Sequence, residues 1–275
     1  MKEFYSFIFI HIRSGFLLFL LCTTAFAQVQ TGWQPAILRN VGIDQKMGSQ
    51  VPLDLPFSDE TGHPATLRQY SGKPVILALV YYQCPSLCNM VLNGVLRSVK
   101  NLTLSAGQDY EIVAVSFDPR ETPEIAAAKR ETYLKGYARA GAERGWHFLT
   151  GEQASSKGLA DAVGFHYAYD SVTNQYAHGS AIMLLTPEGR VSKYFYGINY
   201  PERDLRLGLV EASNRQIGSS IDQVMLYCYH YDPSNGKYGL AIMNVLRLGG
   251  LLTVGALATF MIAMFRRDVR NRGAV

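Results

Sequence analysis

Two cysteines four residues apart, Cys84 and Cys88, are the residues of this sequence whose type and spacing best suit chemistry. Side chains four positions apart on a helix share one face, with Cβ atoms roughly 5–6 Å apart. A disulfide needs Cβ atoms about 3.5–4.5 Å apart, so the pair can clamp one soft metal ion easily and can close to a disulfide after a modest distortion. A purely structural disulfide or two buried thiols is the alternative, although structural bridges seldom lie between a strand and a helix.

The segments on either side of the cysteines predict where they lie in the fold. Residues 75–82 form a β-branched and aromatic run without alternation, which is typical of a central parallel strand buried on both faces. Pro85 suits the first position of a helix, which places Cys84 at the N-cap and Cys88 in the first turns of a helix that includes residues 90–99. A helix N-terminus favours thiolate at this position.

A second buried strand is predicted over residues 111–117, and it ends at Asp118. The helix between the two strands makes them parallel, and such crossovers are right-handed almost without exception. Asp118 is therefore expected at the same edge of the sheet as Cys84, either as a strand-end cap or as a group that tunes the cysteine site. Thr122 is the predicted N-cap of a further helix that runs to about Ala140.

A third candidate for the site is His178, which stands immediately before a predicted hairpin. The hairpin strands are residues 180–186 and 191–196, with proline and glycine in the turn between them. If the first of these strands runs antiparallel to the strand that carries Cys84, it begins at the carboxyl edge of the parallel strands. His178 can then face the two thiols as a metal ligand, although a lone histidine is usually structural.

The rest of residues 51–215 predicts smaller elements and no further metal ligand. Residues 51–67 suggest an initial hairpin with its turn at residues 59–62, residues 146–149 a short strand, and residues 153–163 a short helix. His63 beside the first turn is expected at the surface, and His147 and His166 are expected to be structural.

Both ends of the chain carry membrane-related patterns. A short charged region ends at Arg13, and an apolar stretch then leads to Ala25-Phe26-Ala27, so a secretory signal cleaved after Ala27 is expected. Cys22 would instead indicate a lipoprotein, but Leu21 stands where a small residue is wanted. At the other end, residues 248–265 carry no charge and are just long enough to span a membrane.

The distribution of charge predicts on which side of the membrane the C-terminal tail lies and argues against nucleic acid as a partner. The formal net charge is +4, of which residues 1–27 carry +1 and the arginine-rich residues 266–275 carry +3. The balanced remainder gives no indication of nucleic-acid binding. By the positive-inside rule the basic tail belongs in the cytoplasm, so the main domain is expected on the periplasmic side of the inner membrane, held by a single span.

The sequence therefore predicts six regions. They are a signal peptide (1–27), an N-terminal arm (28–50), an α/β domain (51–215), a juxtamembrane segment (216–239), a transmembrane helix (240–265) and a cytoplasmic basic tail (266–275). Within the juxtamembrane segment, Cys228 and His230 are two residues apart in an aromatic stretch, so they are auxiliary metal-ligand candidates; an interfacial aromatic belt with an incidental thiol is the alternative.

The order of these motifs resembles the Sco/SenC family. The resemblance spans about residues 50–215 and combines the C-P-x-x-C loop, the Asp118–Pro123 segment, and His178 ahead of residues 182–189. It implies a thioredoxin-like fold, copper as the bound metal, and Cys84, Cys88 and His178 as ligands, with Asp118 as the acidic position after the second strand. Two departures, Asn89 where many members have proline and Glu121 where aspartate is usual, indicate a divergent subgroup.

The resemblance also implies a function, for which two alternatives stay open. It implies a metallochaperone that delivers copper to the binuclear copper site of cytochrome c oxidase subunit II or of a related copper protein. Soft thiolates select Cu(I), and imidazole completes a site that can also hold Cu(II), so the chemistry agrees. The same cysteines would serve a thiol–disulfide reductase that keeps the client's cysteines reduced, or a noncatalytic redox or copper sensor.

Overall fold

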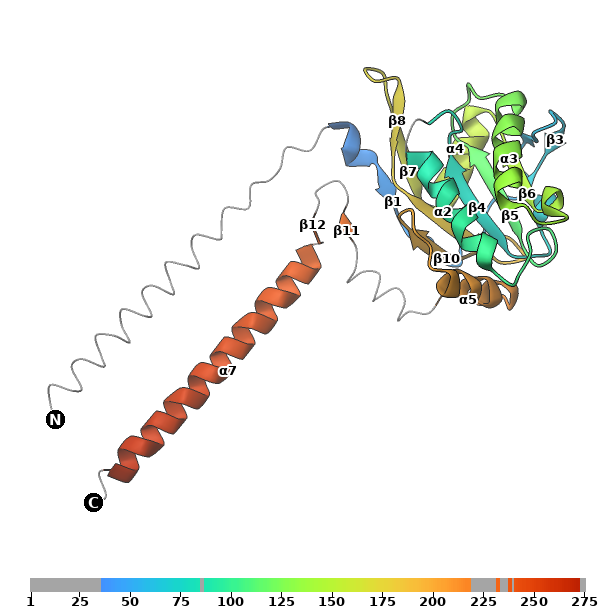
Figure 1. Cartoon of the computed structure of the whole chain (residues 1–275). Helices are drawn as coiled ribbons and strands as arrows, with labels where there is room; N and C mark the ends of the chain where they lie inside the picture. The colour runs from blue at the N-terminus through green and yellow to red at the C-terminus, as the bar shows by residue number, and fades with distance from the viewer. Residues whose placement is uncertain (1–35, 85–86, 219–230, 233–236, 239, 273–275) are drawn as a thin grey trace. The chain divides into compact units, whose positions relative to one another are not determined.

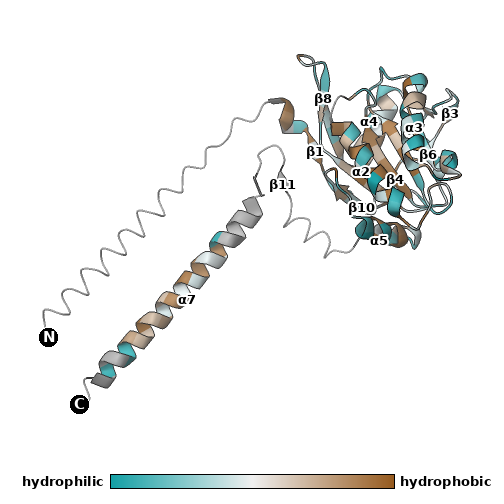
Figure 2. Ribbon diagram, in the orientation of Figure 1, coloured by the Kyte–Doolittle hydropathy of each residue, from teal (hydrophilic) through white to brown (hydrophobic). Residues whose placement is uncertain are grey.

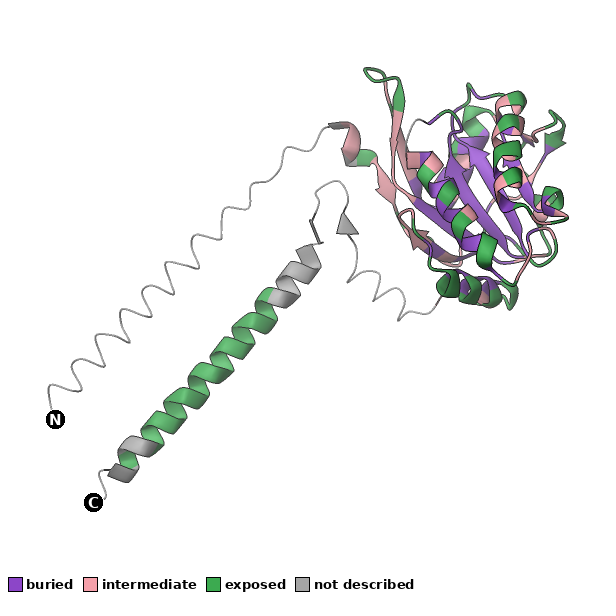
Figure 3. Ribbon diagram, viewed as in Figure 1, coloured by how far each residue is buried: buried purple, intermediate pink, exposed green. Residues whose placement is uncertain are grey.

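The computed structural model describes residues 36–84, 87–218, 231–232, 237–238 and 240–272 (Figure 1). Its centre is a five-stranded sheet with the order β10-β9-β4-β5-β6. The strands are β4 (Val75–Val80), β5 (Glu111–Ser116), β6 (Trp146–Leu149), β9 (Ala181–Leu185) and β10 (Val191–Tyr196). Every residue of β4, β5 and β9 is buried, which explains why these strands read as unbroken apolar runs rather than alternating ones (Figures 2 and 3).

The register of the sheet sets which residues share an edge. β4 and β5 are parallel and in step, with Val75 opposite Glu111 and Val80 opposite Ser116. β9 runs antiparallel to β4, with Val75 opposite Leu185. The segments that follow β4 and β5 and the segment that precedes β9 therefore meet at one edge of the sheet, as the sequence predicted.

Helices connect and cover the strands. They are α2 (Leu87–Asn101), α3 (Pro123–Tyr137), α4 (Gln153–Ala162) and α5 (Glu202–Ser213), with short 3-10 helices η1 (Ala36–Asn40), η2 (Leu67–Tyr70) and η3 (Ala142–Arg144). α2 contacts α3, α5 and β4, so these helices lie together on the sheet. Thr122 is the N-cap residue of α3, and Pro123 occupies its first turn, as predicted.

Two small sheets add to this centre. β2 (Phe57–Ser58) and β3 (Pro64–Ala65) form the predicted initial hairpin. The second small sheet has the order β1-β7-β8 and was not predicted; its strands are β1 (Gly42–Ile43), β7 (Phe165–Asp170) and β8 (Gln175–His178). The β7–β8 hairpin extends beyond the central sheet in Figure 1, and it carries His178 at its end.

The second small sheet also changes the interpretation of the N-terminal arm. The sequence predicted residues 28–50 as an arm or linker, but Gly42 and Ile43 pair with β7. Gly48 donates a backbone hydrogen bond to Val191, and Val51 donates one to Gly189. Residues 42–50 are therefore part of the folded domain, because they form backbone hydrogen bonds with strand groups that would otherwise be unpaired.

The C-terminal part of the chain forms one long helix, α7 (Leu240–Arg272). Two residue pairs form a small antiparallel ladder before it, β11 (Tyr231–Asp232) and β12 (Lys237–Tyr238). Within the described residues, α7 holds the single stretch long and apolar enough to cross a membrane, Arg247–Arg267, with a mean hydropathy of 2.0. The side chains of this stretch are exposed (Figure 3).

Candidate metal centre

Cys84 lies in the loop that follows β4, and Cys88 is the second residue of α2. Both are free thiols, and both are buried, with exposed fractions of 4% for Cys84 and 1% for Cys88. The backbone N–H of Cys88 donates to Cys84 Sγ at 3.4 Å, and the N–H of Tyr81 donates to Cys88 Sγ at 3.4 Å. One backbone N–H group thus points at each sulfur, from the first turn of α2 for Cys84 and from the residue after β4 for Cys88, and both favour negative charge there. The predicted helical position of Pro85 lies outside the described residues.

His178 reaches the cysteines from the end of β8. Its Nε2 lies 3.1 Å from Cys88 Sγ, and its Nδ1 lies 2.6 Å from the carbonyl oxygen of Gly179. A carbonyl can only accept, so Nδ1 carries the proton of the neutral ring. Nε2 is then left with a free lone pair aimed at the sulfurs, which is the arrangement that metal-binding histidines usually adopt.

Two sulfurs and one imidazole nitrogen therefore converge. The ligand atoms of Cys84, Cys88 and His178 all lie within 4.8 Å of one another. A thiolate–zinc bond is about 2.3 Å long, so two donors on one ion of similar size lie up to about 4.6 Å apart. The three donors thus fit a single ion with little rearrangement, and a soft S,S,N donor set suits Cu(I).

Aromatic rings enclose the imidazole. The rings of Tyr81, Phe117 and Phe165 have centroids 6.1, 5.4 and 6.0 Å from that of His178. Phe117 and Phe165 are almost fully buried. These contacts hold the ring in one orientation and keep water from the side of the site that they cover.

The two thiols share one proton unequally. The hydrogen bond that Cys88 donates lowers the pKa of Cys84 to about 3, although burial opposes ionisation. Burial, followed by the hydrogen bond to Cys84, raises the pKa of Cys88 far above its ordinary value. Cys84 is therefore the thiolate of the pair and Cys88 the thiol, and a metal ion that binds both sulfurs must displace the Cys88 proton.

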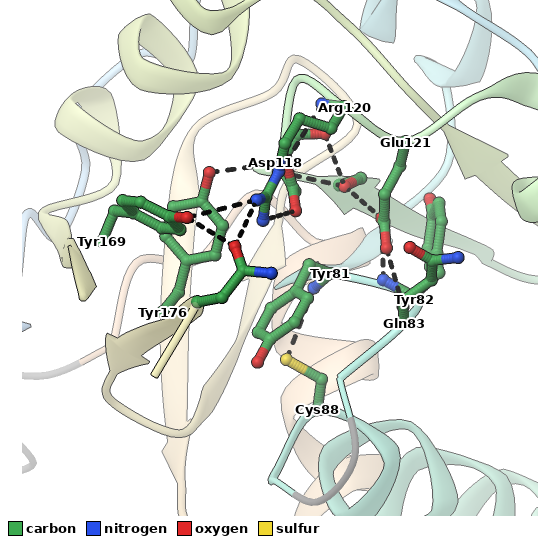
Figure 4. Close-up of polar contacts among 11 residues, drawn as sticks. Tyr81, Tyr82, Gln83, Cys88, Asp118, Arg120, Glu121, Tyr169 and Tyr176 are labelled. Carbon is green, nitrogen blue, oxygen red and sulfur yellow. Dashed lines mark hydrogen bonds and ion pairs between the residues drawn. The ribbon is translucent and has the colours of Figure 1, made fainter. Parts of the chain in front are cut away.

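Glu121 anchors the loop that leads to Cys84. Its carboxylate accepts hydrogen bonds from the N–H groups of Tyr82 at 2.8 Å and Gln83 at 2.7 Å, and from Ser116 Oγ at 2.6 Å (Figure 4). The residue is buried, with an exposed fraction of 6%, and burial raises its pKa. A buried carboxylate with three donors fixes the backbone directly before the first cysteine.

Asp118 lies at the predicted edge of the sheet, but its carboxylate contacts Arg120 rather than Cys88 (Figure 4). Arg120 Nε and Nη2 donate to its two oxygens at 2.8 and 2.6 Å. Burial opposes ionisation, but the hydrogen bonds and charge of Arg120 outweigh it and hold the pKa of Asp118 below its usual value. The cluster of metal-type ligands in the described residues does not include it.

The Asp118–Arg120 pair fastens the β7–β8 hairpin. The Arg120 guanidinium lies 5.1 Å from the ring centroid of Tyr169 and 5.7 Å from that of Tyr176, and Nη1 donates to Asn174 Oδ1 at 2.9 Å. Because the hairpin ends in His178, this contact lies on the path that holds the imidazole near the cysteines.

The other sequence candidates lie elsewhere. His63 contacts Thr61, His147 contacts Glu111, and His166 contacts Asp44, so the three expected surface or structural histidines lie outside the cluster. Cys228 and His230, the auxiliary candidates, lie outside the described residues.

Sequence reasoning missed the supporting roles of Glu121 and Arg120. In the sequence, Glu121 is distinguished only as a departure from the family pattern. No local periodicity reveals that its carboxylate reaches back to residues 82–83. The β7 strand did carry a signal, because Phe165, Tyr167 and Tyr169 alternate with smaller or polar residues.

Comparisons with known proteins agree with this geometry. The SCO1/SenC family model matches residues 45–206. A protein of Stutzerimonas stutzeri, provisionally named as copper-binding, is 26% identical over 163 residues, which cover 56% of this chain and 76% of the relative. A crystal structure of a provisionally named electron transfer protein from Aquifex aeolicus VF5 matches with 27% identity and a TM-score of 0.54, covering 61% of this chain and 95% of that one.

A third similarity concerns the fold alone. BsSco, described as a member of the Sco family of cytochrome c oxidase assembly proteins with a disulfide switch, matches with 22% identity and a TM-score of 0.50. The match covers 62% of this chain and 97% of BsSco. The predicted thioredoxin-like α/β fold is confirmed by these structural matches.

Proposed function

The chain belongs to the SCO1/SenC family, and from this premise we propose that it is a copper chaperone that carries one copper ion on Cys84, Cys88 and His178. The convergence of these three ligand atoms within 4.8 Å carries the proposal. Soft thiolates select Cu(I), and imidazole suits either oxidation state of copper. The relative from Stutzerimonas stutzeri is named for copper binding, which supports this metal.

The proposed client is the binuclear copper site of cytochrome c oxidase subunit II. The description of BsSco as belonging to a family of cytochrome c oxidase assembly proteins supports this choice. Three-coordinate copper leaves room for a ligand of the client to attack. Transfer then proceeds by ligand exchange: a client thiolate binds the ion as a bond to this protein breaks, and copper keeps its oxidation state throughout.

The proposal is tested by mixing the purified protein, loaded with one Cu(I), with copper-free subunit II whose cysteines are reduced. We expect copper to move to the client while the thiol content of both proteins stays constant. Metal in the separated proteins and thiols by mass spectrometry after alkylation are the measurements. Copper retained by the donor, with client cysteines that are free to accept it, would overturn delivery as the function.

The unequal sharing of the proton between the sulfurs favours a second candidate, a thiol–disulfide reductase. The Cys84 thiolate attacks a client disulfide, forms a mixed disulfide and releases one client thiolate. Cys88 then loses its proton and attacks Cys84 Sγ, which releases the second client thiolate. Two electrons pass to the client, and Cys84 and Cys88 end as a disulfide. Starting the same experiment from oxidised subunit II, without copper, measures this reaction.

We further propose that α7 anchors the protein in the inner membrane with the metal centre on the periplasmic side. Arg247 and Arg266 bracket the apolar stretch, and 19 rises of about 1.5 Å put them about 28 Å apart, close to the hydrocarbon thickness. Both charged ends can reach the interfaces, and the basic residues 266–275 favour a cytoplasmic tail.

This topology predicts the result of protease treatment on cells with a permeabilised outer layer. We expect protease to remove an epitope in the folded domain and to spare one placed after Arg272. Both epitopes should disappear when the inner membrane is lysed, which controls for access. A folded domain that stays protected while the inner membrane is intact would contradict the orientation.

A further inference from the structure

Lys129 lies on α3, outside the three ligand candidates, yet hydrogen bonds connect it to the first cysteine. Its Nζ donates to Asn89 Oδ1 at 2.7 Å, and Asn89 Nδ2 donates to the carbonyl oxygen of Cys84 at 2.8 Å. The amide thus uses both of its ends, one on α3 and the other on the cysteine loop. This two-bond path joins segments that are 40 residues apart in sequence.

The position of Lys129 differs from that of an ordinary surface lysine. Lys129 is half-buried, and the partner of its ammonium group is a neutral amide rather than a carboxylate. Lys135, six residues later on the same helix, is instead 75% exposed and pairs with Glu131. A partly desolvated ammonium ion needs compensation from its surroundings.

The groups that stabilise the Lys129 ammonium ion belong to the candidate metal centre or lie beside it. Burial lowers the pKa of Lys129, while its electrostatic interactions with Glu121, Cys88 and Cys84 act in the opposite direction. The ammonium therefore lies within electrostatic range of both sulfurs. Two thiolates around a single Cu(I) carry one net negative charge, which a nearby cation stabilises.

We propose that Lys129 is a positioning residue for Cys84 that acts through Asn89. It fixes the backbone carbonyl of Cys84, so the sulfur stays within reach of Cys88 and His178 in the reduced, metal-binding arrangement rather than in a disulfide. The inference rests on the proposed function where copper is concerned, but its effect on the two thiols is independent of metal.

Glu121 and Lys129 together explain how the cysteine loop is held on both sides. Glu121 accepts from the N–H groups of residues 82 and 83, directly before Cys84. Asn89 donates to the carbonyl of Cys84 itself. Lys129 differs from Glu121 in having no direct bond to the loop backbone, so its effect on the position of the loop must pass through Asn89.

The test uses five variants of the full chain in detergent, four with single substitutions and one that combines Lys129→Met with Asn89→Ala. Lys129→Met removes the ammonium group and keeps an unbranched stem, Lys129→Arg keeps a cation that can donate, and Asn89→Ala removes the bridge. Lys135→Met is the matched control, since it removes an exposed lysine from the same helix. The first measurement is the dithiol–disulfide equilibrium of metal-free protein in glutathione buffers, followed in the peptide that contains Cys84 and Cys88. The second is Cu(I) affinity by chelator competition.

We expect Lys129→Met to shift the equilibrium toward the disulfide by about tenfold, equal to about 30 mV for a two-electron couple. Cu(I) affinity should fall by a similar factor. Asn89→Ala should act in the same direction, and the double variant should be no worse than the more affected single variant, because both residues serve one path. Lys129→Arg should recover most of the effect, and Lys135→Met should behave as wild type.

Two results would overturn the inference. One is a thiol equilibrium within twofold of wild type in both Lys129→Met and Asn89→Ala, and the other is fully additive effects in the double variant. If Lys129→Met fails to fold, an unchanged equilibrium in Asn89→Ala overturns it and a shifted one supports it. A wild-type protein that binds no copper, combined with a shifted thiol equilibrium in the variants, would refute the chaperone function and leave the positioning role supported.

Discussion

Replacing either Cys84 or Cys88 with serine is expected to abolish tight Cu(I) binding, whereas His178→Ala should retain part of it. A serine hydroxyl is a hard, protonated donor that Cu(I) does not favour. Loss of one sulfur leaves a single thiolate and one imidazole, so we expect affinity to fall by more than about 100-fold, beyond the effect of a typical supporting residue. Without His178, two thiolates still hold Cu(I), but Cu(II) loses its imidazole ligand.

Copper stoichiometry and X-ray absorption of the reduced, copper-loaded protein measure these outcomes. His166→Ala is the matched control, because His166 lies on the same small sheet and pairs with Asp44 rather than with the cysteines. Oxidase that lacks its binuclear copper should accumulate in cells that carry each ligand variant. Unchanged copper content in both serine variants, or a wild-type spectrum without sulfur scattering, would end the chaperone proposal and leave the reductase as the better account.

The sheet edge that carries the three ligand candidates could be predicted because it depends on local patterns. Unbroken apolar runs identified β4 and β5, and the crossover helix made them parallel. The turn at residues 187–190 identified the β9–β10 hairpin, and its antiparallel pairing with β4 placed the segment before β9 beside the cysteines. Residue type and topology were then sufficient to bring Cys84, Cys88 and His178 together.

The supports of the site could not be predicted in the same way. Glu121 reaches the loop across 38 and 39 residues of sequence, and Lys129 reaches Asn89 across 40. Such contacts depend on how α3 and the segment that precedes it pack against the cysteine loop, which no periodicity encodes. β1 is only two residues long, too short for any pattern, and it therefore escaped notice as well.

Glu121→Ala is expected to destabilise the folded domain by about 2–4 kcal/mol, because it leaves the buried backbone N–H of Tyr82 without its acceptor and the buried hydroxyl of Ser116 with only its longer contact to the Asp118 carbonyl. A domain of this size should then melt roughly 5–15 °C lower. Glu121→Gln should fall between alanine and wild type, since its amide offers one oxygen where the carboxylate offers two. Thermal unfolding of metal-free protein measures the effect, and Glu124→Ala, an exposed glutamate on the first turn of α3, is the control.

The same substitution should weaken copper binding without removing any ligand. Glu121 holds the N–H groups of the two residues before Cys84, so its loss frees the loop to sample conformations in which the sulfur lies away from Cys88 and His178. We expect Cu(I) affinity to fall by about 10–100-fold at unchanged stoichiometry, the range seen when a residue that orients a ligand is removed. Affinity measured well below the melting temperature separates this effect from unfolding. If Glu121→Ala matched Glu124→Ala in both melting temperature and Cu(I) affinity, the hydrogen bonds to residues 82 and 83 would have no part in shaping the metal centre.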